Sequence, residues 1–115
     1  MLAHGAVLHK NFFSAEQLVA IVKDYRNAAL PPDEVAVMDL AQKVSIRAND
    51  VSQDDVEALR RHGLSDEEIL DVILAAAARN FFSRTLDALN VRPDEAYMDL
   101  EPHLIQVLAL GRPYP

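Results

Sequence analysis

Hydrophobic residues recur at helical spacing along most of the chain, and helix-start and helix-stop signals divide this pattern into segments. The segment from Leu2 to Lys10 has helical composition. A second helix is predicted to begin after Ser14, because Ser14 and Gln17 have the spacing of a capping box. The prolines at 31 and 32 are expected to end it, since proline disfavours a helical residue before it.

The middle of the chain contains signals for two further helices. Pro32 followed by two carboxylates predicts a helix from there to about Ala48, because proline and acidic residues favour a helix N-terminus. Ser52 is expected to cap a short helix over Gln53 to His62, which Gly63 ends in the left-handed conformation.

The longest predicted helix runs from Asp66 to about Leu89, with Ser65 as its N-cap and Asn90 as its C-cap. It is apolar nearly all round between Ile69 and Ala78. A helix without a polar face is normally buried on several sides, so we expect this one to be a buried central helix.

The C-terminal part carries weaker signals. Pro93 begins a further short helix, Pro102 is expected to interrupt it, and His103 to Leu110 form a last turn or two before the tail that starts at Gly111. With no segment resembling a linker, the pattern predicts one all-α domain over residues 1–115.

Composition and charge exclude some classes of binding partner. The net charge of -7 opposes binding to nucleic acid, which draws its affinity from lysine and arginine on phosphates. The longest mostly apolar run, Ile69 to Ala78 with Asp71 within it, is too short to cross a bilayer, and no secretory signal is recognisable. We therefore expect no nucleic-acid partner, no membrane partner and a cytoplasmic location.

The chain contains no cysteine, which excludes disulfides, zinc-thiolate sites and thiol catalysis for this polypeptide. No phosphate loop, Gly-x-Ser-x-Gly elbow or His-Glu-x-x-His helix is present either. His4 and His9 lie roughly 140° apart around a helix and are badly placed to share a metal. The sequence predicts neither a metal nor a cofactor.

Several stretches of the sequence, taken together and in their order along the chain, resemble the peroxidase-related, alkylhydroperoxidase D-like branch of the carboxymuconolactone decarboxylase superfamily. They are Leu2-Ala-His-Gly-Ala-Val-Leu-His-Lys10, Asp24-Tyr-Arg26, Val37-Met-Asp-Leu-Ala-Gln-Lys-Val44, and Asp55-Val-Glu-Ala-Leu to Asn80-Phe-Phe-Ser-Arg84. In that family a helix carries Cys-x-x-Cys-x-x-x-His followed by Gly-Ala-x-Leu, and a later helix ends in Asn-Phe-x-x-Arg. The resemblance implies an N-terminally shortened alkylhydroperoxidase D-like helical domain and a homo-oligomer.

The resemblance aligns His4 with the motif histidine, so the second motif cysteine would fall one residue before Met1. Family members use a thiolate against a hydroperoxide, with a resolving cysteine and with a histidine and an upstream glutamate that relay protons. Of this set only His4 has a counterpart here. The resemblance implies a small-molecule hydroperoxide as a partner of a full-length form of the protein. The alignment also predicts that the codons before Met1 encode a Cys-x-x-Cys, or a decayed version of it, with a glutamate farther upstream.

Three histidines have a structural interpretation beside any functional one. His4 is either a remnant of the proton relay or a histidine of a frayed terminus. His62 is interpreted as a helix-end residue and His103 as a surface residue.

The polar pair near the end of the longest helix has two interpretations. Asn80 and Arg84 lie one turn apart and either line a cleft or have a structural role, with Arg84 paired to Asp87 or to a neighbouring chain. Phe12 and Phe13, like the pair at 81 and 82, are expected in the core or at an interface.

Three functions remain open at this point. The first is a peroxidase-related, antioxidant-linked protein that is inactive as this chain is written. The second is a non-catalytic helical oligomerisation or interaction protein, and the third is a decarboxylase-like enzyme that uses His4 without cysteine. The apolar helix predicts at least a dimer, with Phe12, Phe13 and part of that helix near the interface.

Overall fold

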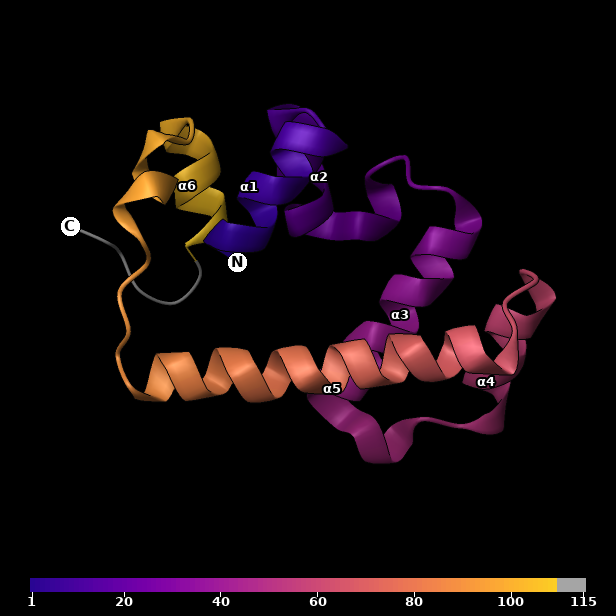
Figure 1. Cartoon of the computed structure of the whole chain (residues 1–115). Helices are drawn as coiled ribbons and strands as arrows, with labels where there is room; N and C mark the ends of the chain where they lie inside the picture. Colours follow the sequence, from indigo (N-terminus) through magenta and orange to yellow (C-terminus); the bar gives the residue numbers. More distant parts are fainter. Residues whose placement is uncertain (110–115) are drawn as a thin grey trace. The chain divides into compact units, whose positions relative to one another are not determined.

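The computed structural model describes residues 1–109, and within this range it contains helices and no β-strand, as predicted. The helices, shown in Figure 1, are α1 (Leu2–Asn11), α2 (Ala15–Asp24), α3 (Pro32–Arg47), α4 (Gln53–Arg61), α5 (Asp66–Ala88) and α6 (Pro102–Leu108), with 3₁₀ turns at Tyr25–Asn27, Ala48–Asp50 and Glu95–Asp99. Leu110 and the tail that begins at Gly111 lie outside the described residues.

The chain divides into two compact units. The middle unit, Leu30–Val91, contains α3, α4 and α5, and the terminal unit combines Met1–Ala29 with the segment from Arg92 onward, including α1, α2 and α6. Each unit has its own cluster of buried side chains. The sequence-based expectation of a single domain stays a prediction.

The predicted capping boxes are confirmed. The Ser14 amide donates to Gln17 Oε1 at 2.9 Å, and the Gln17 amide donates to Ser14 Oγ at 3.2 Å. Ser65 and Glu68 make the same pair of bonds at 2.7 and 3.2 Å. These bonds satisfy amides that the first turn of a helix leaves without an intrahelical acceptor.

The C-terminal ends of α4 and α5 are closed by the same motif. After α4, Gly63 has φ 90°, its amide donates to the Arg60 carbonyl, and the Leu64 amide donates to the Leu59 carbonyl. After α5, Asn90 has φ 57° and the same two bonds recur one helix later. These are Schellman motifs, and glycine and asparagine are the residues that best tolerate the left-handed conformation they require.

Pro102 corrects one prediction. It does not interrupt a helix but starts α6, at a position where its missing amide proton costs nothing and its fixed φ suits the first turn. The preceding segment, Glu95–Asp99, forms only a 3₁₀ turn. At its start the Ala96 amide donates a hydrogen bond to the Asp94 carboxylate.

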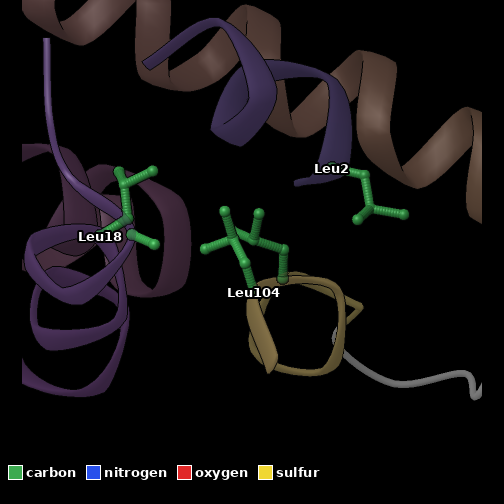
Figure 2. Packing of buried hydrophobic residues seen from close by; sticks show 5 residues of the cluster. Leu2, Leu18 and Leu104 are labelled. Atoms are coloured by element: carbon green, nitrogen blue, oxygen red, sulfur yellow. The ribbon is translucent and has the colours of Figure 1, made fainter. Parts of the chain in front are cut away.

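The core of the terminal unit is built from three helices and the 3₁₀ turn before α6. Figure 2 shows Leu104 of α6 between Leu18 of α2 and Leu2 of α1. Leu104 is fully buried, and Leu108 lies one helical turn later on the same helix. Aliphatic contact between α1, α2 and α6 therefore joins the two ends of the chain in one unit.

The middle unit is held by a smaller cluster. Its buried members are Leu40 of α3, Leu59 of α4 and Ile69 of α5. Helix α3 packs against α5. Figure 1 shows α5 as the long orange helix that α3 crosses.

Within the middle unit, α5 is not buried on several sides as expected. Ile69 is the buried residue of this helix, whereas Leu70, Leu74 and Phe81 are 53%, 55% and 75% exposed. Within the middle unit, α3 and α4 cover one side of this 23-residue helix and leave the other side uncovered. No helix within residues 1–109 is long and apolar enough to span a membrane.

Candidate functional site

His4, the predicted remnant of the catalytic motif, lies in the first turn of α1 and is exposed. Its neighbours Leu2 and Gly5 are both buried against the rest of the terminal unit. The helix is therefore anchored on one side while the imidazole of His4 projects from another.

His9 has a structural role that the sequence did not reveal. Its Nδ1 lies 3.2 Å from the carbonyl oxygen of Phe13, beyond the end of α1. The bond links α1 to the residue before the N-cap of α2. Neither His9 nor any other residue within 1–109 belongs to a group of three or more histidine, cysteine, aspartate or glutamate side chains that could hold a metal.

The remaining histidines match their structural interpretation. His62 is the exposed C-cap of α4. His103 is half exposed, with its Nδ1 3.4 Å from Glu101 in the first turn of α6. Histidines 4, 9 and 103 belong to the terminal unit, whereas His62 belongs to the middle unit.

Asn80 and Arg84 are brought together on one acceptor. Both side chains donate to the carbonyl oxygen of Ser45, Asn80 through Nδ2 and Arg84 through a guanidinium nitrogen, each at 3.3 Å. Ser45 lies in the last turn of α3, where carbonyl groups run short of intrahelical donors and the helix dipole favours a positive charge. The pair therefore caps α3 from α5, which gives the Asn-Phe-x-x-Arg segment a structural role.

The structure shows the Ser45 carbonyl as an acceptor of Arg84. The spacing of the sequence offers no signal for this bond, since 39 residues separate its partners. The partners suggested by the sequence, Asp87 or a neighbouring chain, stay predictions.

Gly5 entered the sequence analysis only as part of the Gly-Ala-x-Leu resemblance, and the structure gives a packing reason for a glycine there. A Cβ at this position would lie 2.9 Å from Leu108 Cδ2 and 3.2 Å from Leu108 Cγ, and closer still to Cδ1. A side chain on residue 5 would therefore require a shift of the Leu108 side chain or of the helices α1 and α6. The signal that could have found it is a glycine inside a helix, which costs about 1 kcal/mol relative to alanine and so calls for a reason.

Asp55, at the start of α4, is a carboxylate with several hydrogen-bond donors. Lys43 Nζ donates to both of its oxygens, at 2.9 and 2.7 Å, and the Ser52 amide and hydroxyl donate to Oδ2 at 2.7 and 2.9 Å. The hydrogen bond from Lys43, followed by that from the Ser52 backbone, lowers the pKa of Asp55 from 3.8 to about 2. The side chains are only 28% and 25% exposed, so this ion pair joins α3 to α4.

Acid should therefore remove the stabilisation that Asp55 provides. Because the pKa is lower in the folded state, the contribution is fully present above about pH 4 and is lost as the pH falls through about 2. We expect Asp55→Asn to lower the unfolding midpoint at pH 6, and the difference from the wild type to shrink steadily between pH 4 and pH 2. Chemical denaturation across this range measures it, with the exposed neighbour substitution Asp54→Asn as control. A difference that stays constant down to pH 2 would contradict the assignment.

Comparison with known proteins identifies the scaffold. No family model matches the chain, and no curated protein matches its sequence. Among solved structures, the chain is similar to a peroxidase-related protein from Ralstonia eutropha JMP134 that is described as an alkylhydroperoxidase AhpD core. The two share 30% sequence identity and superpose with a TM-score of 0.77, over 84% of this chain and 50% of the other.

This chain thus spans half the length of the protein that it matches. The all-α fold class and the resemblance drawn from the sequence motifs are both confirmed by this match. The chain therefore has the helical fold of the alkylhydroperoxidase AhpD core.

Proposed function

We propose that the chain is a peroxidase-related protein of the alkylhydroperoxidase D-like kind, related to antioxidant reduction of hydroperoxides, and that in this sequence it lacks the thiol activity of that family. The observation that supports the relationship is the structural match to an AhpD core at 30% identity with a TM-score of 0.77. The two proteins are therefore similar in sequence as well as in fold. A cytoplasmic location is part of the same proposal.

The proposed lack of activity follows from chemistry. In a thiol peroxidase, a thiolate attacks one peroxide oxygen, the O–O bond breaks, the alcohol leaves with a proton, and the sulfur is oxidised to a sulfenate. A second thiol then condenses with the sulfenate to a disulfide with loss of water, and an external dithiol reduces the disulfide. The 115-residue sequence contains no cysteine, so neither step has its sulfur atom. His4 could move a proton but cannot supply the electron pair.

We therefore expect no reduction of hydrogen peroxide or of cumene hydroperoxide above the buffer rate. The assay follows peroxide loss at fixed times, with dithiothreitol or dihydrolipoamide supplied as reductant and with an equal concentration of heat-unfolded chain as the blank. The expected rate difference is zero within error, and it stays zero in His4→Ala.

The same assay separates the alternatives. Peroxide turnover by the folded chain that His4→Ala leaves unchanged would show that the chemistry is elsewhere. Turnover that His4→Ala removes would show peroxide chemistry that depends on His4 without a thiol, and it would overturn the proposed lack of activity.

A second function, of a different class, is a non-catalytic helical oligomerisation or interaction protein. The observation that favours it is the exposure of Leu70, Leu74 and Phe81 on α5, because soluble chains rarely leave such a patch uncovered. In this proposal the chain forms at least a dimer, with Phe12, Phe13 and part of α5 near the interface. Phe12 is 71% exposed, whereas Phe13 packs partly against the terminal core. Light scattering at micromolar concentration should report a mass above that of one chain.

A further inference from the structure

The exposed side of α5 carries a regular stripe of residues. We use the name α5 seam for Glu67, Leu70, Leu74, Ala77, Phe81 and Arg84, all of which are exposed. Their spacing alternates between three and four residues, the heptad spacing that places side chains on one line along a helix. On another side of the same helix, Ile69, Val72 and Ile73 belong to the core of the middle unit.

We propose that the α5 seam binds the α5 seam of a second copy of this chain, with the two helices antiparallel and Leu74 facing Ala77 of the partner subunit. This proposal rests on the oligomer proposed above and specifies its surface, symmetry and register. The two helices would then be related by a two-fold axis, so each contact occurs twice.

Complementarity along the stripe selects this register. With Leu74 opposite the partner subunit's Ala77, the large Phe81 lies opposite a leucine, Leu70 of the partner subunit. At both ends Glu67 lies opposite the partner subunit's Arg84. The apolar layers are thus enclosed between two pairs of opposite charges, the pattern of an apolar interface core with a polar rim.

The neighbouring registers of the two helices are energetically less favourable. A shift of one heptad in one direction places Arg84 against Leu74 of the partner subunit, and in the other direction it places Glu67 against Ala77 of the partner subunit. Both shifts desolvate a charge against an apolar side chain without an opposite charge to offset it.

The distribution of charge along α5 favours the antiparallel direction. The first half of the helix carries Asp66, Glu67, Glu68 and Asp71, and the second half carries Arg79, Arg84 and Asp87. A parallel pair would place Glu67 beside its own copy and Arg84 beside its own copy, which is repulsive at both ends. An antiparallel pair brings each acidic half beside the more basic half of the other helix and aligns the helix dipoles favourably.

Charge reversal tests direction and register together. Glu67→Arg places two arginines opposite each other at both ends of the pair, so we expect the dimer dissociation constant to rise about tenfold. Arg84→Glu should act in the same way, and the double variant E67R/R84E should restore the wild-type value. Mixing the two single variants should give a heterodimer that is tighter than either homodimer. Sedimentation equilibrium over a dilution series measures all four.

A second set of substitutions, at apolar positions, does not depend on Arg84, which also donates a hydrogen bond to the Ser45 carbonyl. Leu74→Glu places a charge in the centre of the apolar layers, and we expect dissociation to rise about a hundredfold. Ala75→Glu introduces the same charge one residue away, at an exposed position outside the seam, and should change the constant by less than about threefold. Circular dichroism of each variant verifies that the helices are intact.

Each outcome decides the proposal. Wild-type-like dimers in Glu67→Arg and Leu74→Glu would overturn the α5 seam while leaving the proposed oligomer in place, with another surface to be found. A wild-type chain that is monomeric at micromolar concentration would overturn both. If Arg84→Glu does not fold, Glu67→Arg and Leu74→Glu still decide the result. The peroxide assay is independent of every one of these outcomes.

Discussion

Replacing Leu59 with alanine is expected to lower the free energy of unfolding by about 3 kcal/mol. Leu59 is 1% exposed and lies in the core cluster of the middle unit with Leu40 and Ile69. The truncation removes buried apolar surface and leaves a cavity between α4 and its neighbours, which the short α4 cannot close without breaking its caps. A cluster with so few buried members has little else to compensate.

The matched control is Leu89→Ala in the same unit, where the leucine is 70% exposed. The same change in composition should there cost less than about 0.5 kcal/mol. Urea denaturation followed by far-ultraviolet circular dichroism gives both values. Equal losses for the two substitutions would mean that the cluster around Leu59 does not hold the unit together.

Gly5→Val is expected to destabilise the terminal unit by about 2 kcal/mol, although valine is at least as good a helix former as glycine. The new Cβ would overlap the end of the Leu108 side chain, which is 3% exposed and enclosed by the terminal core. Since Leu108 cannot move into solvent, α1 and α6 must separate or the leucine must leave its rotamer. Either adjustment costs more than the gain in helix propensity.

A double-mutant cycle separates this steric cause from a general effect of valine. Leu108→Ala alone should be destabilising because it leaves a cavity, whereas Gly5→Val combined with Leu108→Ala should cost less than the sum of the two, since valine then fills part of the space. The measurement is again the free energy of unfolding. Additive losses would show that Gly5 and Leu108 are not in the close contact that the structure describes.

The helix ends could be predicted from sequence because each depends on a few neighbouring residues. Ser14 with Gln17, and Ser65 with Glu68, bond as a capping box wherever a helix follows them. Gly63 likewise ends α4 through its own backbone freedom. Pro102 was misjudged because proline is compatible both with ending one helix and with starting another, and only the bonds of the following turn decide between them.

The candidate site was less predictable. His4 was found through the resemblance alone, and its exposure on α1 neither supports nor opposes a relay. The shared acceptor of Asn80 and Arg84 was missed, since Ser45 is distant in sequence and offers a backbone carbonyl, which every residue has. The Lys43 to Asp55 pair was missed for a similar reason, because both residues also read as ordinary members of solvated helix faces.

By itself, the sequence determined the helical content, the positions of most helix ends, the absence of a thiol and the resemblance to an AhpD core, because these depend on residue type and short-range spacing. Tertiary structure decided which side of α5 is covered and why Gly5 must lack a side chain. It also decided where Arg84 and Lys43 find their acceptors. These depend on which helices meet, and an apolar stripe has the same pattern whether the same chain or a second copy covers it.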